Sequence, residues 1–506
     1  MRLDDTIWRD LDLGVTLQAD GLDAATLARE APAWAPAFAS MADLEAGSIA
    51  NPDEGRQVGH YWLRAPELAP GDLAGTIRAA REACRSVAAE AHDSGDFDTC
   101  LVLGIGGSAL GPQLVADALA EPDDRLRVVF LDNTDPDGFA RVLGPLDLAR
   151  TLVVVISKSG GTAETRNALV VTREAYARAG VDFPGRAIAV SGEGSTLWRS
   201  AAGWRARLPM WDWVGGRTSL GSAVGILPMD LQGVDADAFL AGAAAMDART
   251  RIPDISANPA ARLALAWHLA TEGTGKRAMV VLPYRDRLVL MSRYLQQLVM
   301  ESLGKEHDLA GRVVHQGLAV YGNKGSTDQH AYVQQLRDGP DDHFVTFLGV
   351  LDDGYHAGEE VEPGLDSGDF LQGFLLGTRS ALQARGRRTI TLLLTTVDAY
   401  RLGALVALYE RAVGLYAARV GINAYDQPGV EAGKKAAAGI LARKGELLGA
   451  LDATARTVEE LCARAGLDGE EACESAWFLL TRLAANERGV VVTHGASPGA
   501  DRFAGA

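Results

Sequence analysis

A loop rich in glycine and hydroxyl groups follows the apolar run Leu152–Ile156, which has the length and composition of a strand buried on both faces. The loop reads Ser157-Lys158-Ser159-Gly160-Gly161-Thr162, and a helical pattern starts at Ala163. Glycines let the backbone approach an anion, and hydroxyls and the N–H groups of a helix start can donate to it. The spacing G-x-x-x-x-G-K-[ST] is absent, so a sugar phosphate fits better than a nucleoside triphosphate. In the alternative interpretation, the Ser and Thr side chains only cap the helix.

A second glycine-rich turn, Gly104-Ile105-Gly106-Gly107-Ser108-Ala109, overlaps the end of the predicted strand Leu101–Ile105. It fits the dinucleotide fingerprint G-x-G-x-x-[GA], and Asp132 closes the next predicted strand, where a ribose-binding carboxylate would stand. An NAD-linked dehydrogenase is therefore one alternative. Two neighbouring anion-binding turns also suit one phosphorylated sugar held between them, and a purely structural glycine turn is the third possibility.

The candidate general base is Glu301. A helix predicted over 286–303 buries apolar side chains at spacings of three and four, which leaves Arg293, Gln297 and Glu301 in one polar stripe. A carboxylate at the end of such a helix is suited to moving a proton between two carbons next to a carbonyl. A solvated polar face is the alternative.

Two further candidates, His330 and Lys434, stand alone in the sequence. His330 follows the loop 322–329, and Lys434 begins a predicted helix. Taken singly, they would be a structural histidine and a surface lysine. The sequence has no H-x-x-x-H pair, no Cys pair and no Asp-rich loop, so we expect no metal site.

Strands alternate with helices on both sides of these motifs, which is typical of doubly wound α/β sheets. The predicted strands fall into two groups, and the region after Asn423 is mainly helical. Residues 1–70 are interrupted by prolines and predict irregular wrapping segments, and the stretch 306–328 shows no obvious strand of its own. The predicted strands are Leu101–Ile105, Arg127–Leu131, Leu152–Ile156, Ala187–Val190, Ala278–Leu282, His343–Leu351, Thr389–Thr395 and Val490–Val492.

The composition is that of an acidic globular chain. Its 506 residues contain 49 Lys and Arg against 66 Asp and Glu, a formal net charge of −17, which argues against a nucleic-acid or anionic-membrane partner. The chain start resembles no signal peptide, and no apolar run is long enough for a membrane span. The four cysteines lack metal-type spacing and indicate reduced thiols, so we expect a cytoplasmic protein.

Six segments stand in a characteristic order along the chain. They are Gly106-Gly107-Ser108, Ser157-Lys158-Ser159-x-x-Thr162, Gly216-Arg217, Gln297-x-x-x-Glu301-Ser302-x-Gly304-Lys305, Gln329-His330-Ala331 and Asp426-Gln427-x-Gly429-Val430-Glu431-x-Gly433-Lys434. This ordered series closely resembles the glucose-6-phosphate isomerase family, also called the phosphoglucose isomerase family. The resemblance extends from Asn51 to Lys434. Gly160-Gly161 and Pro428 depart from the usual family pattern, and the tail after about residue 445 shows no match.

The resemblance implies an α/β fold with two doubly wound, mainly parallel-sheet SIS-type (sugar isomerase) domains, here 96–240 and 241–425. A helical or irregular wrapping segment, 1–95, would pack on the second domain, and a helical region, 426–506, would follow it. It also implies a homodimer that interconverts glucose 6-phosphate and fructose 6-phosphate through ring opening and a cis-enediol. Such proton transfer requires no cofactor and no metal.

Roles at matching positions follow from the same resemblance. Glu301 resembles the base, Arg217 the stabiliser of the enediolate, and His330 and Lys434 the ring-opening pair, with His330 contributed across the dimer interface. The residues that would bind substrate are Gly107, Ser108, Ser157, Lys158 (mainly through its backbone), Ser159, Thr162, Gly216, Gln297 and Gln427. A non-catalytic SIS-type module that senses a sugar phosphate is a further alternative, but it would need only the phosphate loops.

Overall fold

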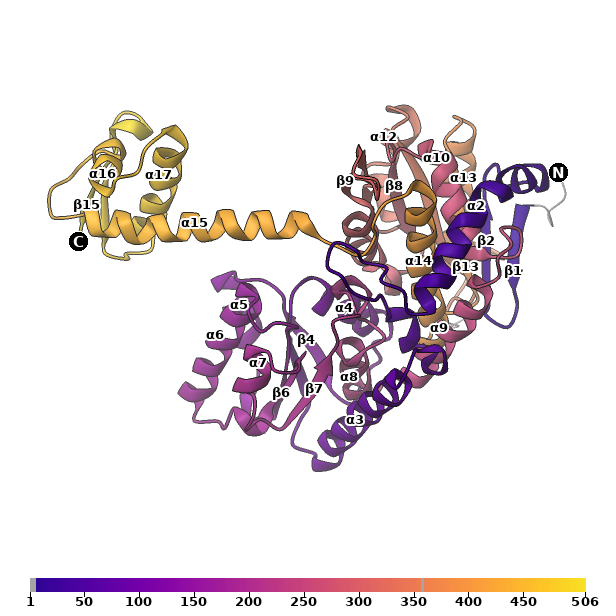
Figure 1. Cartoon of the computed structure of the whole chain (residues 1–506), viewed down its shortest axis with the longest axis horizontal. Helices are drawn as coiled ribbons and strands as arrows, with labels where there is room; N and C mark the ends of the chain where they lie inside the picture. The colour runs from indigo at the N-terminus through magenta and orange to yellow at the C-terminus, as the bar shows by residue number, and fades with distance from the viewer. Residues whose placement is uncertain (1–5, 356–358) are drawn as a thin grey trace. The chain divides into compact units, whose positions relative to one another are not determined.

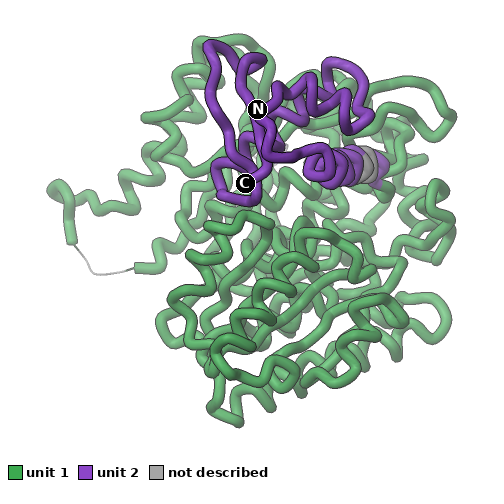
Figure 2. Tube along the Cα trace, turned by 90° about the vertical axis from the view of Figure 1, so that its left-hand side faces the viewer, with its two compact units in different colours: residues 1–426 green, residues 427–506 purple. Residues whose placement is uncertain are grey.

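The computed structural model describes residues 6–355 and 359–506, without the side chains of residues 430–432, 434 and 435. The chain divides into two compact units, Met1–Asp426 and Gln427–Ala506, drawn in green and purple in Figure 2. The first unit contains two sheets with parallel strands, and the second is mostly helical.

The first sheet is parallel throughout, with the strand order β4-β3-β5-β6-β7. Its strands are β3 (Thr99–Leu103), β4 (Arg127–Leu131), β5 (Thr151–Ile156), β6 (Ala187–Gly192) and β7 (Ala206–Met210). Every residue of β3 and β5 is buried, as the apolar runs predict. Helices cover both faces (Figure 1): α3 (Leu73–Ser94), α4 (Leu110–Ala118) and α8 (Ala223–Gln232) on one, and α5 (Pro136–Leu143), α6 (Ala163–Ala179) and α7 (Thr196–Ser200) on the other. The doubly wound sheet is confirmed.

The second sheet has the strand order β1-β2-β13-β12-β8-β11. The strands from β13 to β11 are parallel, whereas β2 and β1 are antiparallel to their neighbours, so the mainly parallel sheet is confirmed. Its strands are β1 (Ile7–Asp10), β2 (Val15–Ala19), β8 (Ala278–Pro283), β11 (Val320–Tyr321), β12 (His343–Val350) and β13 (Thr389–Leu394).

The two faces of this second sheet carry different helices, and successive residues of β8 show which face is which. Met279 and Val281 belong to the large core that contains α9 (Ala236–Thr250), α10 (Pro259–Thr271), α11 (Met291–Leu295) and α14 (Ala399–Val420). Val280 and Leu282 pack instead with α12 (Val333–Asp338) and α13 (Ser367–Gln383). The alternation follows from the two-residue period of a strand.

Residues 1–70 contain more regular structure than the prolines predict. β1 and β2 extend the second sheet, and α2 (Ala24–Glu45) continues through Pro32 and Pro36. Both prolines lie on the exposed side of α2, where the carbonyls that lose an N–H partner can be hydrated instead. Short 3-10 turns follow at η1 (His60–Leu63) and η2 (Pro66–Leu68).

The stretch 306–328 also contains more regular structure than predicted. β9 (Lys305–His307) and β10 (Val313–Gln316) form a hairpin, and β11 pairs with β8 at the edge of the second sheet. β11 spans two residues and is therefore too short to show an alternation of apolar and polar side chains.

The helix predicted over 286–303 is only partly α-helical. A 3-10 turn, η7 (Asp286–Leu288), precedes α11, and a π-helix, η8 (Gln296–Glu301), follows it. π-helices close i→i+5 hydrogen bonds and occur mostly as short segments, frequently at functional sites. Gln297 and Glu301 both lie in η8, whereas Arg293 is exposed on α11.

The second unit has its own small core, with Leu447, Leu461, Leu480 and Phe503 at its centre. Its elements are α15 (Pro428–Ala450), α16 (Val458–Ala465), α17 (Glu470–Ala485), and the antiparallel strands β14 (Val490–Thr493) and β15 (Arg502–Gly505). Within the described residues of both units, no helix is long and apolar enough to cross a membrane.

Candidate functional site

The hydroxyl-rich loop closes tightly at the start of α6. The amide of Gly160 donates to Oγ of the buried Ser157 at 3.1 Å, and the amide of Gly161 donates to Ser159 Oγ at 3.1 Å. Gly160 has φ +71°, and a Cβ there would lie 2.4 Å from the Leu197 backbone nitrogen, so the position accepts only glycine. The loop thus places several hydroxyls and amides around the first turn of α6.

The capping alternative does not account for Thr162. Thr162 is the N-cap residue of α6, but its side chain makes no capping hydrogen bond. Its Oγ1 accepts from Ser157 Oγ at 3.5 Å, which keeps the two hydroxyls together at the helix start. Hydroxyls gathered at a helix N-terminus can bind a phosphate group.

The ammonium of Lys158 is engaged with the segment that leads to Arg217. Its Nζ donates to the carbonyls of Asp212 at 3.0 Å and Val214 at 3.4 Å, and it lies 3.3 Å from the Asp212 carboxylate. Arg56 donates to the same Asp212 carbonyl at 2.6 Å. Burial lowers the pKa of Lys158, and the Arg56 guanidinium lowers it further. The Lys158 ammonium is therefore directed to the 212–214 segment, and its main chain remains in the hydroxyl-rich loop.

The first glycine-rich turn packs against the turn that carries Arg217. These are the 3-10 turns η3 (Gly106–Ser108) and η6 (Gly216–Thr218). A Cβ at Gly107 would lie 2.0 Å from the Gly216 carbonyl oxygen, and one at Gly106 would lie 3.0 Å from Gln297 Nε2. The glycines of the fingerprint thus allow close contact between η3, η6 and η8, which brings Gly107, Gly216 and Gln297 together.

Asp132, the residue expected to bind ribose in the dehydrogenase alternative, is engaged within the protein. Its Oδ2 accepts from Gln113 Nε2 of α4 at 2.8 Å.

Arg217 and Glu301 form the centre of the site. Arg217 is buried, and its Nη1 lies 3.6 Å from Glu301 Oε1. Its Nε donates to Ser302 Oγ at 2.7 Å, and its Nη2 donates to the carbonyls of Asp426, at 3.0 Å, and Ala424. Burial lowers the pKa of Arg217, while Glu301 and Asp426 raise it, and a guanidinium stays charged in such surroundings.

The second carboxylate oxygen of Glu301 has different surroundings. Oε2 is buried and accepts no hydrogen bond from the described residues. A buried carboxylate oxygen normally has a donor, and an exception requires an explanation. An oxygen in this state is available to accept a proton, as a general base requires.

His330 lies on the other side of the second sheet. It is exposed at the end of η9 (Thr327–His330), whose buried Asp328 accepts from the Lys324 amide at 2.8 Å and from the Tyr332 hydroxyl at 2.6 Å. Gln329 donates to the Phe374 carbonyl of α13 at 3.1 Å. α13 covers the face opposite to α11 and η8, and no hydrogen bond or ion pair among the described residues joins His330 to Glu301.

The remaining predicted residues, Gln427 and Lys434, belong to the second unit. Gln427 is the exposed N-cap residue of α15. Lys434 lies in α15, and its side chain is outside the described residues.

Sequence reasoning assigned no role to the residues that hold Arg217 and Glu301 in place. These are Ser302, Lys305 and Asp426, together with Arg56, which donates to the same Asp212 carbonyl as Lys158 of the hydroxyl-rich loop. Lys305 follows Glu301 by four residues, a spacing that could have indicated contact along a helix. Among the described residues, no group of three or more His, Cys, Asp or Glu is arranged to hold a metal ion.

The fold and the site define a class: α/β proteins with a glycine- and hydroxyl-rich loop at a helix start and a buried pair of acid–base groups. The family model described as "Phosphoglucose isomerase" matches residues 40–361 and 375–455, and this chain belongs to that family. Glucose-6-phosphate isomerase from Geobacter sulfurreducens is 56% identical over 92% of this chain and 91% of its own length. The crystal structure of a glucose-6-phosphate isomerase from Chlamydia trachomatis, at 28% identity, covers 86% of this chain and 89% of its own, with a TM-score of 0.78.

The tail after residue 445 is not peculiar to this chain. The glucose-6-phosphate isomerase of Citrifermentans bemidjiense is 52% identical over 97% of this chain and 96% of its own length. A match of that extent includes most of the tail. The tail therefore has counterparts in the family, and the expectation that it has no match is wrong.

Proposed function

We propose that this chain catalyses the reversible isomerisation of glucose 6-phosphate and fructose 6-phosphate, through ring opening and a cis-enediol. The pairing of Arg217 with Glu301, in a chain of this family, is the observation that carries the proposal. The reaction moves a proton between two carbons next to a carbonyl, which requires a base and a fixed positive charge. Glu301 supplies the base, and Arg217 supplies the charge that stabilises the enediolate.

The substrate phosphate binds at the start of α6. Ser108, Ser157, Ser159 and Thr162 donate through their hydroxyls, and the backbone of Lys158 contributes its amide. The packing of η3 against η6 supports this assignment, because it brings the Ser108 turn to the turn that carries Arg217. Gln297 and Gln427 orient the sugar of the substrate, and the Gly107 and Gly216 backbones line the site.

His330 and Lys434 open the sugar ring, and the His330 concerned comes from a second copy of the chain. Glu301 and His330 belong to elements that pack on opposite faces of the second sheet, η8 with the large core and η9 against α13, which supports a shared site. In a homodimer with two-fold symmetry each copy contributes its His330 to the other copy, so that one interface completes both sites. His330 is exposed on its own chain, as a residue that serves a neighbour should be.

A reducing, cytoplasmic location accompanies this proposal. All four cysteines are unpaired, and Cys84 and Cys100 are buried. Burial raises the pKa of each of these two thiols to about 12, which keeps them protonated and unreactive.

A coupled assay tests the function. Fructose 6-phosphate is supplied with NADP and a glucose-6-phosphate dehydrogenase reporter, and formation of NADPH follows the isomerisation. We expect turnover that depends on this protein and survives exhaustive dialysis against EDTA. Absence of turnover by folded protein would contradict the proposal, and loss of activity that only a metal ion restores would contradict the metal-free mechanism.

A further inference from the structure

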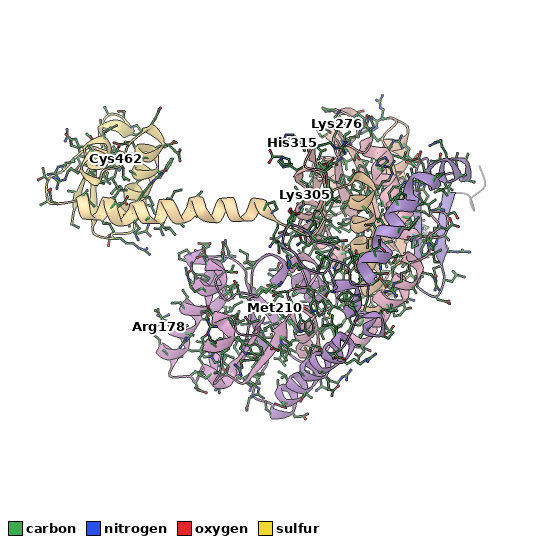
Figure 3. All side chains as sticks on the ribbon, in the orientation of Figure 1. Arg178, Met210, Lys276, Lys305, His315 and Cys462 are labelled. Atoms are coloured by element: carbon green, nitrogen blue, oxygen red, sulfur yellow. The ribbon has the colours of Figure 1, made fainter. Side chains whose placement is uncertain are left out.

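Lys305 is a buried cation beside the proposed site, and the sequence motifs gave this lysine no role. It follows the π-helix η8 and lies in the first unit, where Figure 3 labels it. Its side chain is only 5% exposed. Nζ donates to the main-chain carbonyl of Glu301 at 2.9 Å and to that of Asp426 at 3.2 Å, and it lies 3.2 Å from Asp426 Oδ1.

These contacts close a ring around the catalytic pair. Lys305 and Arg217 both donate to the Asp426 carbonyl, at 3.2 and 3.0 Å. Arg217 faces the Glu301 carboxylate, and Lys305 binds the Glu301 carbonyl. Four residues from three separate parts of the chain are thus connected in a cycle, and Lys305 is the member that joins Glu301 to Asp426.

The position suits a cation for two physical reasons. The last carbonyls of a helix lack N–H partners, and a positive side chain there satisfies them and complements the helix dipole. Burial lowers the pKa of Lys305, but the Asp426 carboxylate opposes this effect, and that carboxylate is itself only 13% exposed. Removing one partner of such a pair leaves the other charge uncompensated.

We infer that Lys305 is a positioning residue that holds Glu301 and Arg217 in the geometry for proton transfer by tying both to Asp426. The inference rests on the proposed function. Lys305 does not touch the reacting atoms in this account, and it acts through the residues that do. Its loss should therefore affect the transition state more than substrate binding, because small misplacements of catalytic groups are costly for the chemical step.

The test compares Lys305→Met with Lys305→Arg and the control Lys276→Met in the coupled assay. Lys276 is an exposed lysine of the first unit, so its substitution removes a charge without changing the ring of contacts around Arg217 and Glu301. We expect Lys305→Met to lower kcat about 10- to 100-fold with KM within about threefold of wild type. Lys305→Arg retains the cation and should recover most of kcat, and Lys276→Met should match wild type.

The variant Asp426→Asn provides a second, independent arm. It keeps the Asp426 carbonyl that both cations use but removes the ion pair, so it should lower kcat by several-fold. The double variant Lys305→Met/Asp426→Asn should have a kcat no lower than that of Lys305→Met alone, because the effects of residues that act together are not additive. If Lys305→Met does not fold, Lys305→Arg and Asp426→Asn decide the matter, and unchanged kcat in Asp426→Asn then overturns the inference.

Two kinds of failure remain distinguishable. An inactive wild-type protein would contradict the proposed function itself. An active wild type with unchanged kcat in folded Lys305→Met, or with KM raised in proportion to the loss of kcat/KM, would overturn the positioning role alone.

Discussion

At the scale of residues, the two oxygens of the Glu301 carboxylate have different surroundings. Oε1 faces the Arg217 guanidinium, while Oε2 is buried with no hydrogen-bond donor among the described residues. The sequence predicted both residues from motifs that lie far apart, and the structure places them 3.6 Å from each other. The sequence alone could not predict that Ser302 and Asp426 hold Arg217, because those contacts depend on how separate loops meet.

Replacement of Glu301 by glutamine should remove the basic carboxylate and preserve the size and shape of the side chain. We expect kcat to fall by roughly a hundredfold to ten-thousandfold, the range typical of a general base, with KM changed by only a few-fold. The coupled assay measures both constants. Glu306→Gln, at an exposed carboxylate five residues later, is the matched control and should match wild type. Activity of Glu301→Gln within a few-fold of wild type would refute the assignment.

At the scale of elements, the π-helix η8 is the feature that sequence patterns could not predict. Apolar residues continue at spacings of three and four through Met291, Leu295 and Leu298, so the pattern indicates one continuous α-helix. The change to i→i+5 bonding occurs where Gln297 meets the turn at Gly106. The strand–loop–helix unit around β5 and α6 was predictable, because a buried apolar strand and a glycine-rich loop have strong local signals.

The turn Gly104–Ala109 should not bind a dinucleotide. Gly107 lies directly against the Gly216 carbonyl and Gly106 against Gln297, so protein atoms lie where the close approach of a pyrophosphate would be needed. We expect no NADH binding at micromolar concentrations by fluorescence or calorimetry, whereas fructose 6-phosphate should produce binding heat in the same cell. Stoichiometric NADH binding would revive the dehydrogenase alternative.

A buried ion-pair network joins η1 to α9 and α14. Asp247 lies 2.9 Å from Arg64 Nη2, 2.7 Å from Arg411 Nη2 and 2.6 Å from Arg251 Nη2. Burial alone would raise the pKa of Asp247, but the three guanidiniums outweigh it and lower the pKa to about 2. The charged form of the Asp247 carboxylate is thus favoured in the folded chain. The network stabilises the packing of these elements.

Asp247→Asn should therefore destabilise the fold. Removing a buried partner from such a network costs about 3–5 kcal/mol, measurable by urea unfolding at neutral pH. Because the folded pKa lies below the unfolded value of about 3.9, this contribution is present above about pH 4 and is lost as the pH falls toward 2. The exposed Asp237→Asn is the control. Equal stability of the two variants would show that Asp247 contributes little.

At the scale of the whole molecule, the second sheet carries different elements on its two faces. η8 packs with the large core on one face, α12 and α13 pack on the other, and Gln329 of η9 donates to the Phe374 carbonyl of α13. The mainly parallel order of both sheets could be predicted from the alternation of strands and helices. The pairing of β1 and β2 at the edge and the insertion of β11 beside β8 could not, since short or edge strands leave weak patterns and depend on long-range contacts.

Subunit mixing tests the central claim most directly, namely that Glu301 of one copy and His330 of another complete each site. His330→Ala and Glu301→Gln proteins, each nearly inactive, are mixed in equal amounts and allowed to exchange, with exchange verified by native mass spectrometry. About half of the dimers are then mixed, and each mixed dimer has one intact site, so activity should recover to roughly a quarter of wild type under two-fold symmetry. Verified exchange without recovered activity would contradict the shared site, and with it this account of how the fold performs the reaction.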